Sequence, residues 1–582
     1  MRKPISLYAG SIMKVVGATL VLGPVFAAGS TTAVSQTKPP NVILIMSDDM
    51  GMNDIEPFGQ TVVKTPALTQ LAQEGVRFSN FHVLPVCSPT RAQLLTGVDI
   101  HLAGLGSMAE VRTSKVIAQG EGYRGILSDR VQTIAEVLKE GGYATFMSGK
   151  WHLGGAEKAN PLSRGFDRSY VLADGGGSHW DHVGLLAIKP KSTYLEDGKP
   201  TERPSGVFSS DMFTDRFLGY LQDALRQNKP FFGYLAFQAV HDPLHAPKAS
   251  VEKYKGKFSS GYDVYRKEIF ERMKTVGVIS PSATMWPVPP LFKPWAELTS
   301  DERKHQERLM EVYGGMLDNM DMNIERVLNT LRAAGVYDNT IIIFLSDNGP
   351  SAVYMDLYSG NADGKWISQT FDLSFENFGN QGSFFAVGPG WATGSSAPFR
   401  LFKSFLTEGG TRSPLIVKAP GVAKPGRINT SFVGVEDIFP TLTALTGVER
   451  GDLRNGVPLV PLKGASIVPT LLGEKDVAHG PDYERGDEFW GQKVYRKGDW
   501  KLLWLPRPFG SGEWQLYQTQ DDPGETLDLA AAHPNLVAEL SQKYRRWAEA
   551  HNVMEWDYPF LHEKIFDFTD WTKGMRSQVG AK

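Results

Sequence analysis

The residues Asn41-Val42-Ile43-Leu44-Ile45-Met46-Ser47-Asp48-Asp49 decide how the fold is predicted. Their apolar centre, residues 42–46, has the length and composition of a buried strand, and it leads directly into two carboxylates. Three further strand-like runs end in polar groups in the same way. They are residues 341–345 before Ser346-Asp347-Asn348-Gly349, residues 143–147 before Gly149-Lys150-Trp151-His152, and residues 231–237 before His241-Asp242-Pro243.

Amphipathic helical segments alternate with these runs. That pattern is typical of an α/β fold with a large mixed, mostly parallel sheet sandwiched by helices. In open sheets of this kind the ligand crevice lies beyond the carboxyl ends of the strands. We therefore expect the four strand ends to deliver their polar groups to one edge of the sheet, where a functional site would form.

The 582 residues are enough for one large domain and a smaller one. The character of the sequence changes after about Lys475. Residues 490–505 have the pattern of an antiparallel hairpin, and residues 534–551 have that of an amphipathic helix. We expect a catalytic domain over residues 38–474 and a C-terminal α+β domain with an antiparallel sheet over residues 475–582.

The N-terminus has the layout of a secretory signal, predicted over residues 1–28. Met1-Arg2-Lys3 precede an apolar stretch over residues 15–26 and the small residues Ala27, Ala28 and Gly29. The alternative is a membrane anchor, but the stretch is shorter than the roughly 20 residues that a spanning helix needs. We expect a periplasmic or secreted protein without stable membrane insertion. The net charge of -3 gives no electrostatic footprint for nucleic acid.

Cys87 is the only cysteine of the sequence, so no internal disulfide can form. Most free cysteines are inert buried thiols, but the neighbours of this one indicate a different role. Ser88 suits a helix N-cap, Pro89 the first helical position and Gly97 the stop, which places Cys87 at a helix N-terminus. Backbone N–H groups favour an anion there, and Arg91 can point back to the same place.

Two groups of polar residues suggest an anion held between a metal and fixed cations. The oxygens of Asp48, Asp49, Asp347 and Asn348 suit Ca²⁺ or Mg²⁺, although such residues also simply mark turns after strands. The possible cations are Lys150, His152, His241 and Lys403. A lysine or histidine taken alone is more often a surface lysine or a hydrogen-bonded histidine, so only the combination of the four is informative.

The run Cys87-Ser88-Pro89-Thr90-Arg91, followed by Leu95-Thr96-Gly97, resembles the Cys-x-Pro-x-Arg signature of the sulfatases, members of the alkaline phosphatase superfamily. Their cysteine is oxidised to Cα-formylglycine. Companion runs stand in the same order as in sulfatases, namely residues 149–154, 346–349 and 408–412. Residues 103–110 are similar to a run of bacterial arylsulfatases, and the resemblance extends from about Asn41 to the C-terminal domain.

This resemblance implies one Ca²⁺ per chain, bound by Asp48, Asp49, Asp347, Asn348 and the hydrated formylglycine at position 87. Arg91 and Lys150 would stabilise the hydrate, and Lys150, His241 and Lys403 would grip the sulfate oxygens. His241 or Lys403 would protonate the leaving alcohol, Asp347 would act as the base for attack, and His152 would take the proton of the second hydroxyl. The resemblance also implies a formylglycine-generating or other sulfatase-maturating enzyme as a partner, and it leaves the roles of Asp242 and His245 open.

The predicted function is an arylsulfatase that converts an aryl sulfate and water to a phenol and sulfate. One alternative is a phosphodiester or phosphonate monoester hydrolase, because related enzymes share the fold and the formylglycine. Another is a catalytically silent, Ca²⁺-dependent glycan-binding protein. A binding protein has no use for an acid and a base together, so the full set of polar residues favours an enzyme. Aryl, alkyl and sugar sulfates all stay open as natural substrates.

Overall fold

The computed structural model describes residues 38–556 except 112–115, 117, 119, 156–157, 289–291, 355–360 and 362–364. The chain divides into a unit before Pro39 and one compact unit from Pro39 onward. The predicted signal peptide lies outside the described residues, as do residues 557–582 of the predicted C-terminal domain. Among the described helices, none has the length and the apolar character needed to span a membrane.

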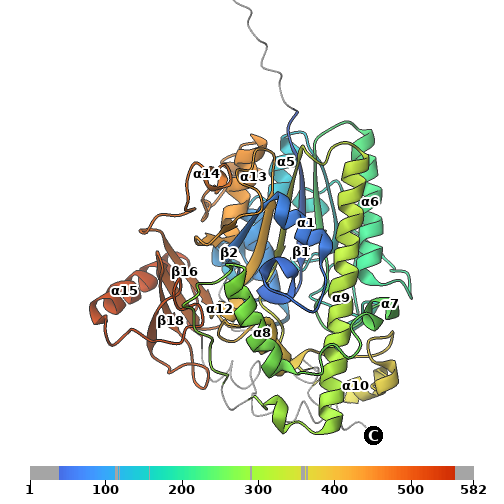
Figure 1. Cartoon of the computed structure of the whole chain (residues 1–582). Helices are drawn as coiled ribbons and strands as arrows, with labels where there is room; N and C mark the ends of the chain where they lie inside the picture. The colour runs from blue at the N-terminus through green and yellow to red at the C-terminus, as the bar shows by residue number, and fades with distance from the viewer. Residues whose placement is uncertain are drawn as a thin grey trace, which may run out of the picture. The chain divides into compact units, whose positions relative to one another are not determined.

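A mixed, mostly parallel sheet of eleven strands forms the centre of this unit (Figure 1), as the sequence predicts. Five neighbouring strands run parallel in the middle. In spatial order they are β10 (Thr340–Ser346), β1 (Asn41–Ser47), β9 (Phe231–Ala236), β3 (Ala144–Lys150) and β4 (Arg168–Leu172). All seven residues of β1 are buried, because a central strand of a parallel sheet is covered on both faces.

Shorter strands extend the sheet on both sides. Antiparallel β11 and β2 continue it beyond β10, with β12 and β13 parallel to β2, and antiparallel β7 and β8 continue it beyond β4. Their bounds are β11 (Arg412–Lys418), β2 (Val76–His82), β12 (Ile428–Asn429), β13 (Val433–Gly434), β7 (Tyr194–Glu196) and β8 (Lys199–Thr201).

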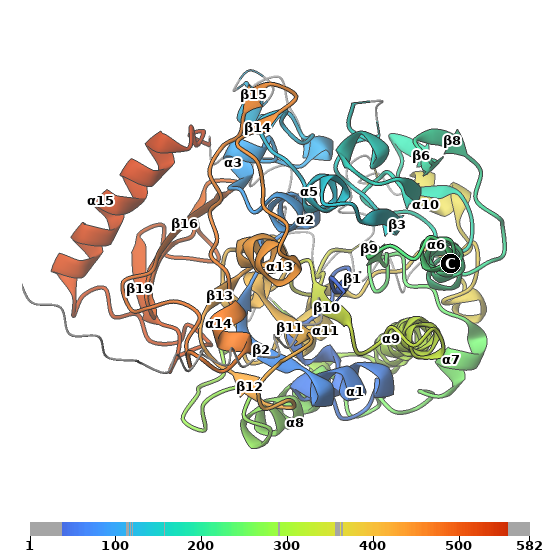
Figure 2. The same cartoon turned by 90° about the horizontal axis from the view of Figure 1, so that it is seen from above.

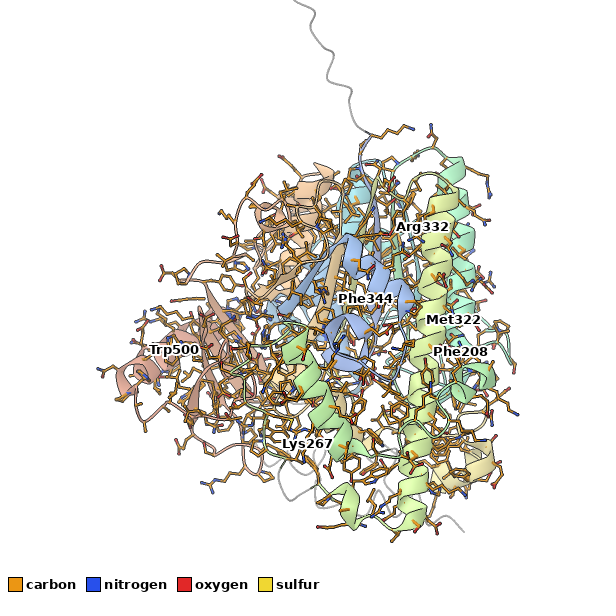
Figure 3. The ribbon with its side chains drawn as sticks, in the orientation of Figure 1. Phe208, Lys267, Met322, Arg332, Phe344 and Trp500 are labelled. Carbon is orange, nitrogen blue, oxygen red and sulfur yellow. The ribbon has the colours of Figure 1, made fainter. Side chains whose placement is uncertain are left out.

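Helices cover both faces of the sheet (Figure 2). One layer contains α1 (Pro66–Glu74), α6 (Ser209–Arg226) and α9 (Ser300–Ala333), and the other contains α2 (Cys87–Thr96), α5 (Ile134–Glu140) and α13 (Ile438–Thr446). The long helix α9 is amphipathic: its Met316 and Met320 lie in the core, whereas Met322 is 48% exposed (Figure 3). Phe344 of β10 is fully buried between the layers.

The structure has further helices outside these two groups. Their bounds are α3 (Ile100–Ala103), α7 (Lys248–Glu252), α8 (Tyr262–Thr275), α10 (Lys365–Thr370), α11 (Gly388–Ser395), α12 (Glu408–Thr411) and α14 (Val468–Leu471). Two small hairpins add β5 (Val183–Leu186) with β6 (Lys189–Lys191), and β14 (Leu453–Arg454) with β15 (Val457–Pro458). The β5–β6 hairpin contributes side chains to the candidate active site.

An antiparallel sheet follows near the C-terminus, as the sequence predicts. It consists of β16 (Glu484–Phe489), β17 (Gln492–Lys497), β18 (Trp500–Trp504) and β19 (Trp514–Gln518), and it packs against α15 (Pro534–Ala550). Since the described residues from Pro39 onward belong to one compact unit, the domain boundary at residue 475 stays a prediction.

Candidate active site

Cys87 is the first residue of α2, at the N-terminus where the sequence predicts it. The N-cap is Val86 rather than the predicted Ser88, because the carbonyl of extended Val86 already accepts the N–H of Thr90 at 3.4 Å. Pro89 therefore occupies the third helical position, where its missing N–H forfeits no intrahelical hydrogen bond. Gly97 ends the helix with a left-handed φ of 66°, as predicted.

The strand ends meet at one edge of the sheet, next to Cys87. Asp48 and Asp49 follow β1, Asp347 and Asn348 follow β10, and all four residues are buried. The Cys87 Sγ lies 3.4 Å from Asp48 Oδ1 and 3.9 Å from Asp49 Oδ1. The structure thus brings the cysteine and the predicted oxygen ligands together.

Each of three carboxylates in this cluster is paired with a cation. Lys150 Nζ lies 2.5 Å from Asp48 Oδ2, and Lys403 Nζ lies 2.6 and 2.7 Å from the two oxygens of Asp49. Arg91 donates from Nε and Nη2 to Asp347 Oδ2 at 3.0 and 2.7 Å. Buried charges are tolerated when they are paired and hydrogen-bonded in this way.

The pKa values reflect this balance between burial and charge. Burial alone would raise the pKa of Asp49, but Lys403, His241 and Lys150 hold it well below its ordinary value. Burial raises the pKa of Asp347 to about 6, with Asp48 adding to the effect and Arg91 opposing it. Burial also raises the pKa of the Cys87 thiol well above its ordinary value, so an unmodified thiol here is protonated and a poor nucleophile.

His241 faces the cluster through its Nε2 atom, which lies 3.6 Å from Asp49 Oδ2. Its Nδ1 lies 2.7 Å from the carbonyl oxygen of Asp242, which can only accept, so Nδ1 carries the hydrogen of the neutral ring. Burial, together with Lys403 and Lys150, lowers the pKa of His241 to about 3 despite Asp49. The hydrogen bond from Nδ1 to the backbone carbonyl of Asp242 sets the orientation of the His241 ring.

His245, the other residue whose role the sequence left open, has a structural environment. Its Nε2 donates to the carbonyl of Ser383 at 2.8 Å, and its Nδ1 accepts the backbone N–H of His179 at 3.2 Å. Both ring nitrogens are thus used to hold backbone segments together.

His152 is held by a residue that sequence reasoning missed. Its Nε2 lies 3.0 Å from Glu110 Oε1, whereas its buried Nδ1 has no hydrogen-bond partner among the described residues. Burial would raise the pKa of Glu110, but the charge of His152 and its hydrogen bond lower this pKa to about 2. The only signal in the sequence was the position of Glu110 at the end of the run over residues 103–110.

Two glycines after β4 allow both histidines to approach the chain. A Cβ at Gly175 would lie 2.8 Å from His152 Nε2, and a Cβ at Gly176 would lie 3.2 Å from His241 Cε1. The first distance is shorter than van der Waals contact permits. The glycine run at residues 175–177 was the signal in the sequence that could have located this close approach of the chain to the two histidines.

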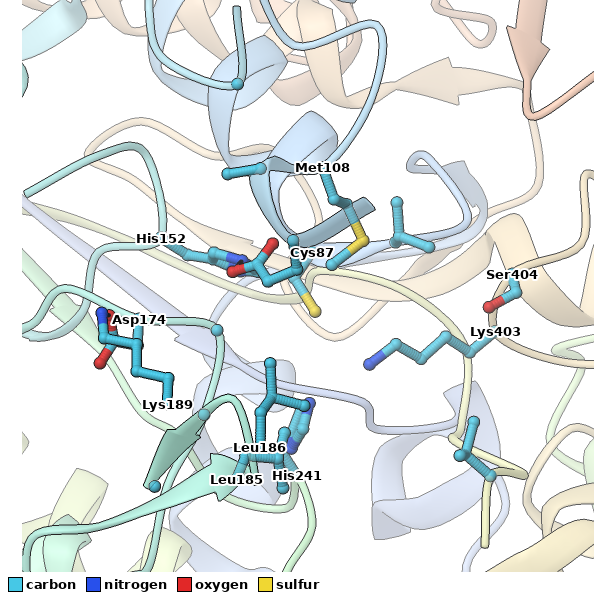
Figure 4. A pocket seen from close by; sticks show the side chains of 18 of the residues that line it. Cys87, Met108, His152, Asp174, Leu185, Leu186, Lys189, His241, Lys403 and Ser404 are labelled. Atoms are coloured by element: carbon cyan, nitrogen blue, oxygen red, sulfur yellow. Dashed lines mark hydrogen bonds and ion pairs between the residues drawn. The ribbon is translucent and has the colours of Figure 1, made fainter. Parts of the chain in front are cut away.

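A cavity of about 470 Å³ opens onto Cys87 (Figure 4). His152, His241 and Lys403 line it, and the Lys403 side chain extends toward Cys87 in the figure. Much of the remaining lining is apolar, and Lys189 and Asp174 form an ion pair in it. The apolar lining includes Met108, Leu185, Leu186, Phe402, Phe405 and Trp490.

The donor set fits a hard divalent cation. One potential ligand atom each from Asp48, Asp49, Cys87 and His241 lies within 4.8 Å of the others. Asn348 Oδ1 is buried with no hydrogen-bond partner in the described part of the chain, while its Nδ2 donates to Asp49 Oδ1 at 2.7 Å. Carboxylate and amide oxygens are ligands that Ca²⁺ and Mg²⁺ prefer. Asp347, predicted as a ligand, bonds Arg91 and the backbone N–H of Asp49.

The chain is similar to known sulfatases over most of its length. The sulfatase family model matches residues 40–448. An uncharacterised sulfatase of Schizosaccharomyces pombe is 38% identical over 91% of this chain and 97% of its own length. An arylsulfatase of Klebsiella aerogenes is 36% identical over 76% of this chain and 93% of its own.

A solved structure shows the same fold. The crystal structure of Ps i-CgsB superimposes with a TM-score of 0.64 at 22% identity and covers 94% of this chain and 98% of that one. The family model and the two relatives confirm the resemblance that the cysteine run predicts. The chain belongs to the sulfatase family and is a sulfuric ester hydrolase.

Proposed function

We propose that this enzyme is an arylsulfatase that uses a formylglycine derived from Cys87 and one bound Ca²⁺. The observation that carries the proposal is the position of Cys87. Its Sγ lies 3.4 Å from Asp48 and 3.9 Å from Asp49, and both carboxylates are paired with lysines that can face a sulfate group. The arylsulfatase activity named for the Klebsiella aerogenes relative supports the same substrate class.

Formylglycine suits this position better than a thiol. The hydrated aldehyde supplies two hydroxyl groups, one for attack on sulfur and one whose deprotonation allows sulfate to leave. Cys87 is fully buried in the folded protein. We therefore propose that a formylglycine-generating or other sulfatase-maturating enzyme acts on the chain before α2 is packed into the fold.

The metal would be held by Asp48, Asp49, Asp347 and Asn348 together with the modified residue 87. A Ca²⁺ held there would polarise a sulfate oxygen and neutralise part of its negative charge. Asn348 Oδ1 has no hydrogen-bond partner among the described residues, which supports this assignment, because a buried oxygen without a partner is costly unless it binds an ion or water.

The protein groups around the metal site bind and orient the substrate. Lys150 and Lys403 place positive charge beside the predicted sulfate position, and Arg91 fixes Asp347 in place. Burial would lower the pKa of Lys403, but Asp49 holds it above its ordinary value, so this ammonium group keeps its proton. Glu110 holds Nε2 of His152 and leaves Nδ1 to accept a proton.

The shape of the cavity supports an aryl leaving group. Apolar and aromatic side chains form much of its wall beyond the charged cluster, and a pocket of this kind suits a flat apolar group with few polar contacts. The N-terminal sequence further leads us to propose that the protein is exported to the periplasm or secreted.

Two chromogenic substrates test this function. The metal-loaded enzyme should hydrolyse 4-nitrophenyl sulfate faster than bis(4-nitrophenyl) phosphate. Chelation should abolish the activity, and Ca²⁺ should restore it better than Zn²⁺. A strong preference for the phosphodiester would instead favour a phosphodiester or phosphonate monoester hydrolase. No turnover of either compound would contradict the proposal.

A further inference from the structure

The turn between β16 and β17 of the C-terminal sheet reaches the cavity above Cys87. Trp490 in this turn is only 5% exposed and lines the cavity. Its indole Nε1 donates to Ser107 Oγ at 3.4 Å, next to Met108 in the cavity wall. Trp490 has a φ of 50°, an unusual conformation for a bulky residue. Such conformations persist only where the surroundings hold them, and they cluster at functional sites.

Gln492, two residues further on, holds the segment that carries Lys403. Its Oε1 accepts the backbone N–H of Leu406 at 2.9 Å, and its Nε2 donates to the carbonyl of Ser404 at 2.7 Å. The N–H of Ser404 donates in turn to the carbonyl of Pro85 at 2.7 Å, two residues before Cys87. Gln492 is 1% exposed, so these hydrogen bonds are shielded from water.

Buried ion pairs join β17 and β18 of the same sheet to α12 of the catalytic layers. Glu408, at the start of α12, pairs with Arg496 of β17 and, at 2.9 Å, with Lys501 of β18. Lys501 also lies 2.6 Å from Glu525. All four side chains are buried, so breaking one pair would leave an uncompensated buried charge. These pairs attach the C-terminal sheet to the segment that follows Lys403.

We propose that Trp490 in the β16–β17 turn is part of the substrate site and that Gln492, the first residue of β17, supports that site from outside the cavity. Trp490 determines specificity by packing its ring against the leaving group. Gln492 is a positioning residue that fixes the Lys403 ammonium group for binding of the sulfate group. This inference rests on the proposed function, since it takes the cavity as the leaving-group site and Lys403 as a sulfate ligand.

Because the two residues have different tasks, removing each side chain should weaken the binding of a different ligand. Trp490 lies with Met108, Phe402 and Phe405 in the apolar part of the wall, so its removal should affect an aromatic ligand and not inorganic sulfate. Gln492 does not line the cavity and acts through Lys403, so its removal should affect sulfate and not an uncharged ring.

Calorimetric titration of the metal-loaded, mature enzyme with inorganic sulfate and with 4-nitrophenol, at a pH low enough to keep the phenol protonated and uncharged, tests this directly. Trp490→Ala should weaken 4-nitrophenol binding about tenfold and change sulfate binding less than about twofold. Gln492→Ala should show the reverse pattern. Trp490→Phe keeps an aromatic ring and should retain most of the 4-nitrophenol affinity, which separates a lost contact from a lost fold.

Matched controls come from the same sheet. Trp504→Ala on β18 and Gln518→Ala on β19 change residues that do not line this cavity, and both should bind the two ligands as the wild type does. Equal weakening of both ligands by Trp490→Ala and by Gln492→Ala would overturn the inference, and so would no weakening by either. A wild-type enzyme without sulfate binding and without turnover of 4-nitrophenyl sulfate would instead overturn the proposed function.

Discussion

Arg91 donates two hydrogen bonds to a single oxygen of Asp347, from Nε at 3.0 Å and from Nη2 at 2.7 Å. The other oxygen of Asp347 accepts the backbone N–H of Asp49 at 3.3 Å, and Arg91 Nη1 donates to the carbonyl of Lys150 at 2.8 Å. One guanidinium group thus connects α2 to the ends of β3 and β10. It fixes the distance between Cys87 and the acidic residues.

Removal of Arg91 should destabilise the protein. Arg91→Ala leaves the fully buried carboxylate of Asp347 without its cation, which typically costs about 3–5 kcal/mol of unfolding free energy. Arg216→Ala removes an exposed partner of Glu196 and should cost less than about 1 kcal/mol. Urea unfolding of both variants checks this, and a loss below about 1 kcal/mol for Arg91→Ala would show that the pair is not structural.

Gly175→Ala should reduce activity without unfolding the protein. Its Cβ would lie 2.8 Å from His152 Nε2, so the imidazole has to move from its contact with Glu110. A displacement of a catalytic group by about 1 Å typically costs about 100-fold in rate. Gly219→Ala on α6 is the control, because nothing lies within 4 Å of its Cβ. Normal turnover in Gly175→Ala would mean that the position of His152 is not critical.

The two candidate donors of a proton to the leaving alcohol differ in the structure, because Lys403 keeps its proton whereas the neutral ring of His241 carries its hydrogen on Nδ1, against the carbonyl of Asp242. Loss of a general acid matters more for a basic leaving group, so the correct residue should show a larger effect on phenyl sulfate than on 4-nitrophenyl sulfate. For that residue we expect a loss of about 100-fold or more with phenyl sulfate and a clearly smaller one with 4-nitrophenyl sulfate. Steady-state rates of His241→Asn and Lys403→Ala provide the comparison. Equal losses on both substrates in both variants would exclude these two residues as the acid.

Glu110 should contribute stability that depends on pH. Its pKa in the folded protein is about 2 against an ordinary 4.5, so the folded state favours the carboxylate. This contribution is fully present above pH 4.5 and is lost as the pH falls from 4.5 toward 2. In Glu110→Gln, the unfolding free energy should therefore fall less steeply below pH 4.5. Parallel pH profiles of the two proteins would show that Glu110 is not stabilised by His152.

The sequence predicted the central sheet and the charged cluster because both depend on local patterns. Apolar runs such as residues 42–46 identify buried strands by themselves, and parallel neighbours bring their carboxyl ends together whatever the loops do. Asp48 and Asp347 come directly after β1 and β10, Lys150 is the last residue of β3, and His241 lies in the loop that follows β9. Predicting that these residues meet at one edge of the sheet therefore required only the order of the strands.

The residues that sequence reasoning missed are joined to the site by contacts between distant segments. Glu110 is 42 positions from His152, and Trp490 reaches the cavity from a separate antiparallel sheet. Loops such as the one that carries Gly175 have no periodicity that would place them. The N-cap is Val86 and not Ser88 for a local reason, because the backbone carbonyl of Val86 already accepts the N–H of Thr90.

The state of residue 87 tests the central claim most directly. Peptide mass spectrometry across position 87, on protein purified from a host with a sulfatase-maturating enzyme, should find formylglycine in place of cysteine. The same preparation should hydrolyse 4-nitrophenyl sulfate, and Cys87→Ala should be folded and inactive. A wild-type enzyme that is active with an unmodified cysteine, or activity retained in Cys87→Ala, would contradict the account.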